Sequence, residues 1–325
     1  MLGAILLRPV GNSSKRFAIT EILNSEVISK MLRGVLIPLI TPFDNDEQVD
    51  EGVMRSLVDF YVQSSVQGLF VLGSTGQGPA MSIPQRIKAA ETALDQTRGR
   101  LPVVIHVGTA DTESTVELAR HAHQKGASAI AVVPSYYYSD KSEYEIICHY
   151  RRVSQAVPLP IFIYENPKYS GISIPPQFAM RMKEQVPAIQ GIKVAYGMGA
   201  LLEYVRLFPS DVSVFTGNAD IFGLVPFGLA GMINPPTSFL PELCVELWNA
   251  LETKNYEKAV ATQKRVNTAW SLVGDAFRRY GRSALGELLR MRGFPVKRFP
   301  KWETKQMSAG DCDALRAEVK KAGLL

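Results

Sequence analysis

The chain has 325 residues, of which 46% are hydrophobic and 21% are charged. This is ordinary globular composition, sufficient for a large core. The formal net charge is only +5 and no basic stripe suits a nucleic acid, so we expect small-molecule partners and no nucleic-acid partner. No apolar run approaches the roughly 18 residues that a membrane span needs, so we expect no membrane insertion.

The cysteines and histidines do not have the spacing of metal ligands. Cys148, Cys244 and Cys312 lie far apart, which indicates reduced thiols and favours a cytoplasmic location. His121 and His123 are two residues apart, so a helix would point them in different directions. The sequence therefore predicts neither a metal nor another cofactor.

Residues 1–32 differ from the rest of the chain and are predicted to be a poorly packed leader. The apolar Met1–Leu7 is short for a signal peptide and is followed by no clear cleavage site. An organelle transit segment is an alternative, against which Glu21 and Glu26 argue weakly. The interpretation that we favour is that Met31 is the biological start.

From Gly34 onward, strand and helix patterns alternate. Eight apolar runs are typical of buried parallel strands: 34–40, 68–72, 102–107, 129–133, 161–163, 189–192, 212–215 and 231–233. Helical patterns follow most of them: 51–66, 84–96, 114–124, 143–155, a helix opened by Pro175-Pro176, 221–229 and 241–251. Eight such units predict an α/β fold, a (β/α)8 TIM barrel over residues 33–252.

A doubly wound open sheet is the alternative fold. It would normally carry a glycine-rich phosphate turn after its first strand, and Thr41-Pro42-Phe43-Asp44 contains no glycine. After the barrel, residues 253–325 are predicted to form a C-terminal helical appendage, with helices over 256–270, 273–291 and 311–324.

Polar side chains follow several of the predicted strands. Lys193 comes directly after a buried strand, and Tyr164 ends the strand before it. Ser74 and Thr75 follow the second strand, between Gly73 and Gly76. In a barrel of this kind the reactive groups lie at the carboxyl ends of the strands, so these side chains should converge on one rim.

A lysine in this position predicts Schiff-base chemistry. A free lysine has a pKa of about 10.4 and is almost entirely protonated at pH 7, but burial at an apolar strand end disfavours the ammonium form. The amine of Lys193 can then attack a ketone, and the protonated imine stabilises a carbanion on the adjacent carbon. Tyr164, bonded to Ser74 or Thr75, can shuttle the protons. Gly73 and Gly76 would let backbone N–H groups approach a carboxylate.

Each of these residues also has an ordinary structural interpretation. A lysine at a strand end is more often a salt-bridge partner on the rim, and a single tyrosine there usually packs against its neighbours. The run Tyr136-Tyr137-Tyr138 is compatible with an interface patch.

The order of the motifs resembles one known family. From Leu32 to Leu325 the chain is similar to the dihydrodipicolinate synthase/N-acetylneuraminate lyase family of class I, Schiff-base aldolases. The resemblance is carried by four motifs: Gly73-Ser74-Thr75-Gly76, Tyr136-Tyr137-Tyr138, Tyr164-Glu165-Asn166-Pro167 and Gly191-Ile192-Lys193.

This resemblance implies a role for each motif. Lys193 would form the imine with pyruvate or another 2-oxo acid, and Tyr164 would be the acid/base hydroxyl. Ser74 and Thr75 would bind the substrate carboxylate and relay protons. Tyr137 would reach across a dimer interface, with Tyr136 and Tyr138 as alternatives.

The resemblance also implies that Gly217 and Ile233 line the pocket and that the protein is a homotetramer, a dimer of dimers. One departure concerns the substrate. Dihydrodipicolinate synthases usually carry an arginine two residues after the proline of the tyrosine motif, where this chain has Tyr169. The glycine and tyrosine motifs look nearest to those of 2-keto-3-deoxy-gluconate aldolases.

We therefore predict a lyase that cleaves or forms a 2-keto-3-deoxy sugar acid by aldol chemistry, with a 2-oxo acid and an aldehyde as its small-molecule partners. The alternatives within this chemistry are 4-hydroxy-tetrahydrodipicolinate synthesis from pyruvate and aspartate semialdehyde, and dehydration of a 2-keto-3-deoxy acid. A catalytically silent barrel that binds a 2-oxo acid is the alternative outside it.

Overall fold

The structure is a computed structural model that describes residues 32–325 apart from 196, 209 and 210. The leader predicted over residues 1–32 lies, except for its last residue, outside the described residues. Residues Arg33–Leu325 form one compact unit, so the C-terminal helices belong to the same unit as the barrel.

Eight parallel strands close into a barrel. They are β1 (Gly34–Pro38), β2 (Gly68–Val71), β3 (Val103–His106), β4 (Ala129–Val132), β5 (Ile161–Glu165), β6 (Ile189–Val194), β7 (Ser213–Thr216) and β8 (Gly231–Met232). Each strand pairs with the next, and β8 returns to pair with β1. This closure confirms the predicted TIM barrel and rules out the open sheet, which would leave two unpaired edges.

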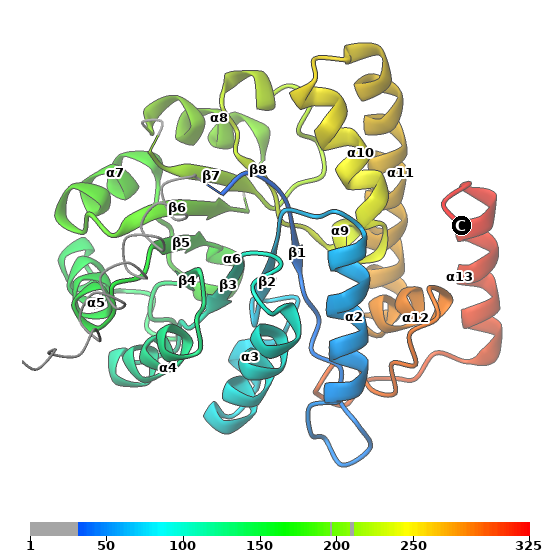
Figure 1. Cartoon of the computed structure of the whole chain (residues 1–325), viewed down its shortest axis with the longest axis horizontal. Helices are drawn as coiled ribbons and strands as arrows, with labels where there is room; N and C mark the ends of the chain where they lie inside the picture. The colour runs from blue at the N-terminus through cyan, green and yellow to red at the C-terminus, as the bar shows by residue number, and fades with distance from the viewer. Residues whose placement is uncertain (1–31, 196, 209–210) are drawn as a thin grey trace, which may run out of the picture. The chain divides into compact units, whose positions relative to one another are not determined.

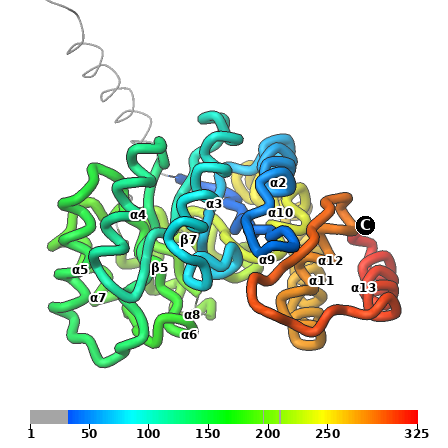
Figure 2. Tube along the Cα trace, turned by 90° about the horizontal axis from the view of Figure 1, so that it is seen from below, coloured from blue at the N-terminus to red at the C-terminus, as the bar shows by residue number. Residues whose placement is uncertain are grey.

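Helices surround the strands, as Figure 1 shows. Around the barrel lie α2 (Glu51–Gln63), α3 (Ile83–Thr97), α4 (Thr112–Gln124), α5 (Glu143–Ala156), α6 (Pro167–Ser170), α7 (Pro176–Gln185), α8 (Met198–Leu207), α9 (Pro235–Phe239) and α10 (Pro241–Glu252). The C-terminal region adds α11 (Tyr256–Tyr280), α12 (Ser283–Met291) and α13 (Ala309–Lys321). Figure 1 and the turned view of Figure 2 show α13 on the side of α11 away from the strands, while α12 packs against both α11 and α9.

The strands are buried because apolar side chains from both of their faces are covered. Every residue of β1 to β5 is buried, and the polar side chains among them, His106, Tyr164 and Glu165, all lie at the carboxyl ends of their strands. No helix within residues 32–195, 197–208 and 211–325 is long and apolar enough to cross a bilayer.

Two helix predictions were wrong. The helix expected over 221–229 is only a 3-10 turn at Val225–Phe227. Pro226 has no N–H to donate in a helix interior, and Gly228 at φ +109° ends the turn. The helices expected over 256–270 and 273–291 are α11 and α12, and the break falls at Gly281. Gly281 has φ +65° and ends α11 as glycine commonly ends a helix. Helix α8 was not predicted.

Closing the barrel requires a glycine at position 231. A Cβ added to Gly231 would lie 1.8 Å from the carbonyl oxygen of Gly34, its partner in the β1–β8 pairing.

Replacing Gly231 with alanine should therefore lower the free energy of unfolding by about 3 kcal/mol, as overpacking does. Thermal unfolding followed by circular dichroism measures the effect. Gly199→Ala, in the exposed first turn of α8 with nothing within 4 Å of the added carbon, is the control and should leave stability nearly unchanged or slightly raised. Equal melting temperatures for the two variants would contradict this explanation.

Candidate active site

Lys193 and Tyr164 face each other across two neighbouring strands. In the β5–β6 pairing they are direct partners in register, and Lys193 Nζ lies 3.4 Å from Tyr164 Oη. Ile163 and Ile192, one residue earlier on each strand, belong to the hydrophobic core outside the barrel. Because side chains alternate along a strand, Tyr164 and Lys193 point to the opposite face, the barrel interior.

The amine of Lys193 is buried against aromatic rings. The residue is 6% exposed, and its Nζ lies 4.7 Å from the ring centroid of Phe70 and 4.4 Å from that of Tyr164. Within the described part of the chain no carboxylate forms an ion pair with it. The structure thus gives Lys193 no rim salt bridge, and it has the apolar surroundings in which a lysine amine serves as a nucleophile.

Tyr164 Oη is the centre of a hydrogen-bond network. It lies 3.0 Å from Ser74 Oγ, and it accepts hydrogen bonds from Asn166 Nδ2 at 3.1 Å and from Lys193 Nζ. Burial raises the pKa of the Tyr164 phenol, but the charge of Lys193 and the hydrogen bonds from Ser74, Asn166 and Lys193 outweigh it, so the pKa falls below its ordinary value. A phenol of lowered pKa gives up its proton more readily, as an acid/base group must.

The loop after β2 brings Ser74, rather than Thr75, to this network. Thr75 is half-buried beside it. A Cβ on Gly73 would lie 2.7 Å from Cε1 of Phe70, and one on Gly76 would lie 2.7 Å from the carbonyl oxygen of Leu39. Close packing by itself requires both glycines, and their predicted contact with a carboxylate stays a prediction.

The other predicted pocket residues also lie at strand ends. The Gly217 amide N–H donates to the carbonyl of Val194, and that of Ile233 donates to the carbonyl of Thr216, both at 2.8 Å. Gly217 and Ile233 therefore follow β7 and β8 at the rim where Lys193 lies. Their contact with substrate stays a prediction.

Tyr137 lies apart from this network. Its side chain is 83% exposed, and its backbone has φ +83°, which is rare for a bulky residue. Within the described residues no hydrogen bond joins Tyr137 to Tyr164 or Lys193. Its ring contacts that of Tyr138, which is also exposed. The structure leaves the predicted role of Tyr137 at an interface open.

Sequence reasoning missed two residues that border the network. His106, at the end of β3, is buried and its ring lies edge-on to Tyr164, with the centroids 5.6 Å apart. Burial, together with the nearby charges of Arg86 and Lys193, keeps the pKa of His106 well below its ordinary value, so this ring is neutral. Asn166 was part of a recognised motif, but only the geometry shows that its amide holds the phenol.

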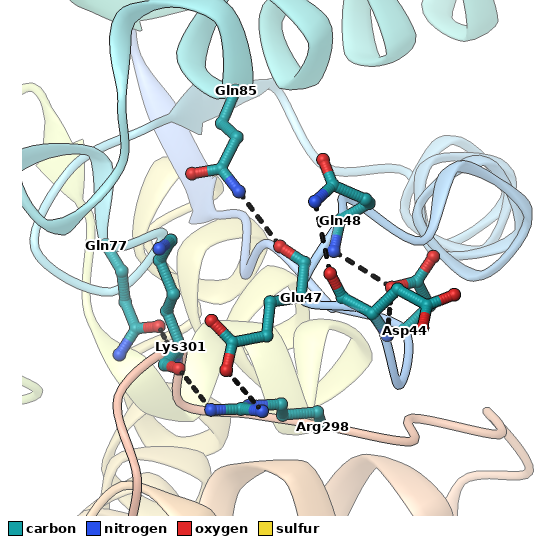
Figure 3. Close-up of polar contacts among 8 residues, drawn as sticks. Asp44, Glu47, Gln48, Gln77, Gln85, Arg298 and Lys301 are labelled. Carbon is teal, nitrogen blue, oxygen red and sulfur yellow. Dashed lines mark hydrogen bonds and ion pairs between the residues drawn. The ribbon is translucent and has the colours of Figure 1, made fainter.

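The C-terminal region also reaches the loops of the barrel mouth. Figure 3 shows Gln77, which follows the glycine motif, accepting a hydrogen bond from the Lys301 backbone N–H at 2.8 Å. In the same view Arg298 pairs with Glu47 at 2.9 Å, and the Glu47 carbonyl accepts from the Gln85 side chain at 2.9 Å. These contacts fasten the loops after β1 and β2 to the segment before α13. No sequence pattern pointed to this connection, because its partners lie more than two hundred residues apart.

Comparisons with known proteins agree with this geometry. Residues 31–321 match the model of the dihydrodipicolinate synthetase family. The chain belongs to this family. Over 235 residues, 72% of this chain and 80% of the relative, it is 31% identical to the 4-hydroxy-tetrahydrodipicolinate synthase of Alkaliphilus oremlandii (strain OhILAs). Family membership makes the chain a Schiff-base lyase, an enzyme of the class I aldolase type.

Solved structures show the same fold. YagE, a prophage protein of E. coli K12 solved in complex with pyruvate, superposes with a TM-score of 0.82 at 25% identity, covering 90% of this chain and 99% of that one. The N-acetylneuraminate lyase of Proteus mirabilis superposes with a TM-score of 0.81 at 22% identity, covering 91% and 100%, and this likeness is of the fold. Within the described residues, no group of three or more His, Cys, Asp or Glu side chains converges as a metal site would.

The hydrogen bond from Ser74 can be tested through the pH dependence of turnover. It is one of the contacts that lower the pKa of Tyr164, so Ser74→Ala should raise this pKa. The limb of the pH–rate profile that reports the Tyr164 proton should then move to higher pH, and turnover should fall by about 10-fold or more. Ser74→Thr keeps a hydroxyl and is the matched control, whose limb should stay close to that of the native enzyme. A limb that Ser74→Ala leaves in place would exclude Ser74 from the control of this proton.

Proposed function

We propose that the enzyme forms an imine between Lys193 and a 2-oxo acid such as pyruvate, and uses it for aldol cleavage and condensation of a 2-keto-3-deoxy sugar acid. The observation that carries the proposal is the buried amine of Lys193, 3.4 Å from the phenol of Tyr164 and without a carboxylate partner among the described residues. A silent binding barrel would have no need of this pair.

The chemical steps follow from these positions. The amine attacks the keto carbon, and loss of one water molecule gives the imine. In the cleavage direction the C4 hydroxyl loses its proton, the C3–C4 bond breaks, and its electron pair moves through C3 to the protonated imine nitrogen as the aldehyde leaves. C3 then takes up a proton, and water hydrolyses the imine to release pyruvate. Tyr164 Oη lies 3.4 Å from the nitrogen that forms the imine, so in this proposal it exchanges protons with the substrate bound there.

The hydroxyl pair after β2 is given separate roles in this proposal. Ser74 relays protons to Tyr164, since their oxygens lie 3.0 Å apart. Thr75 and the backbone around Gly73 and Gly76 hold the carboxylate of the 2-oxo acid. The loop after β2 can offer its backbone N–H groups to this anion.

Two further features extend the proposal to the assembly of the protein and to its location in the cell. Tyr137 has a strained backbone and an exposed ring, as a residue that completes a neighbouring subunit's site would have. This supports the homotetramer built of dimers. The three free cysteines support a cytoplasmic location.

The residue two positions after the proline of the tyrosine motif, Tyr169, supports a 2-keto-3-deoxy sugar acid as the substrate class. Tyr169 occupies the place of the arginine usual in dihydrodipicolinate synthases, which argues against that enzyme's way of holding aspartate semialdehyde. Synthesis of 4-hydroxy-tetrahydrodipicolinate remains the second candidate, because relatives of that name are about 30% identical over nearly three quarters of this chain.

Borohydride reduction tests the imine directly. The enzyme incubated with pyruvate and borohydride should gain the mass of the reduced adduct on Lys193, and Lys193→Ala should gain none. Lys168→Ala, which removes an exposed lysine near the same rim, is the control and should keep the adduct. Pyruvate that binds without an adduct would favour the silent barrel.

Removing the phenol separates imine formation from proton transfer. Tyr164→Phe should still form the reducible adduct but should lower turnover by about 10²-fold or more, because the aromatic ring remains while the hydroxyl group that would transfer the proton is removed. Steady-state rates of pyruvate release from a 2-keto-3-deoxy sugar acid measure this. Turnover equal to that of the native enzyme would remove Tyr164 from the mechanism.

A further inference from the structure

Arg282 joins the C-terminal region to the mouth of the barrel. It lies in the short break between α11 and α12, and its Nη1 donates to the backbone carbonyl of Ser74 at 3.1 Å. Its Nη2 donates to Tyr169 Oη at 2.8 Å. The side chain of Ser74 is hydrogen-bonded to Tyr164, so Ser74 links the guanidinium of Arg282 to the hydrogen-bond network around Lys193.

The positive charge of Arg282 is not neutralised by the described part of the chain. Neighbouring arginines each pair with a carboxylate: Arg278 with Asp275, Arg279 with Glu318, Arg290 with Glu287 and Arg292 with Glu242. Arg282 has instead a carbonyl, a phenol and two aromatic rings, those of Tyr169 at 5.8 Å and Trp302 at 5.9 Å. A half-buried guanidinium without a carboxylate can take one from a ligand.

The same edge carries a second cation. Lys168 Nζ lies 5.6 Å from the ring centroid of Tyr169, and among the residues described it too has no ion pair with a carboxylate. Tyr169 is 52% exposed and stands between these two positive groups. Two cations without a carboxylate partner in the described chain at the rim beside β5 favour an anion there, while the amine proposed to capture the keto group is buried inside the barrel on β6.

We propose that Arg282, together with the hydroxyl of Tyr169, binds a carboxylate at the far end of the substrate. The aldehyde that leaves then carries this carboxylate unchanged, and the substrate class is a 2-keto-3-deoxy sugar diacid rather than a monoacid. This rests on the imine chemistry proposed above. In this proposal the positive charge that binds the distal carboxylate comes from Arg282 in the C-terminal region, because position 169 is an uncharged tyrosine.

The geometry of a guanidinium suits this task. It has five N–H donors in one plane, and the bonds to Ser74 and Tyr169 leave others free for the two oxygens of a carboxylate. The existing bonds and the two rings hold the group in place before the substrate arrives, so little side-chain entropy is lost on binding.

A purely structural role for Arg282 makes a different prediction. If its bond to the Ser74 carbonyl only positions the loop after β2, losing it would affect every substrate by a similar factor. If it binds the distal carboxylate, the loss would fall mainly on substrates that have one. The ratio of the specificity constants for two matched aldehydes therefore separates the two roles.

The experiment condenses pyruvate with two aldehydes that differ at one carbon. They are 2-hydroxy-3-oxopropanoate and glyceraldehyde, in which a CH2OH group replaces the carboxylate. The native enzyme should favour the carboxylate-bearing aldehyde in kcat/KM by about 10-fold or more, the range expected of a charge-assisted hydrogen bond. Arg282→Gln should lower this preference by about 10- to 100-fold, and Arg282→Lys should keep part of it. Arg278→Gln, one turn earlier and paired with Asp275, is the matched control and should leave the preference unchanged.

Borohydride trapping of pyruvate on the same variants separates this inference from the function on which it rests. Arg282→Gln should still trap pyruvate on Lys193. A native enzyme that traps pyruvate but prefers glyceraldehyde, or an Arg282→Gln variant that lowers both specificity constants equally, would overturn the inference while leaving the imine chemistry standing. A native enzyme that traps no pyruvate would overturn both.

Discussion

The site depends on one buried amine that the protein leaves without a counterion. Lys193 lies on the interior face of β6, buried against the rings of Phe70 and Tyr164 and without a carboxylate partner among the described residues. A protein retains such a residue when the charge can be removed or used. The parallel register of β5 and β6 places the Tyr164 phenol opposite it, so the strand pairing that stabilises the barrel also assembles the reactive pair.

The hydrogen bonds around Tyr164 couple this pair to the loops. Ser74 approaches from the loop after β2, and Asn166 approaches from the turn that follows β5. Both lower the pKa of a phenol that burial alone would raise. The same small set of contacts therefore fixes where the phenol lies and how readily it gives up its proton.

The C-terminal helices are part of the site as well as of the fold. Arg282 holds the Ser74 carbonyl, and the Lys301 backbone holds Gln77 three residues further along the same loop. Loops at a barrel mouth are ordinarily the mobile and variable part of this fold. Here a region outside the barrel is hydrogen-bonded to the loop that carries Ser74, and brings a cation to the rim. Substrate preference can thus change in the C-terminal region while the barrel keeps its chemistry.

The sequence by itself determined the barrel, its eight strands and the placement of Lys193 and Tyr164 near the carboxyl ends of neighbouring strands. It could do so because buried parallel strands are short apolar runs, and consecutive strands of a closed barrel are neighbours. Tyr164 and Lys193 lie one residue before the ends of two consecutive strands, so their proximity followed from the strand order. Only the tertiary structure decided that Ser74 rather than Thr75 is hydrogen-bonded to the phenol of Tyr164. The sequence does not tell which of two adjacent loop side chains points toward the phenol. It also decided that Arg282 lies at the mouth of the barrel. Ser74, the partner of Arg282, is 208 residues away, and contacts between such distant segments depend on packing rather than on local pattern.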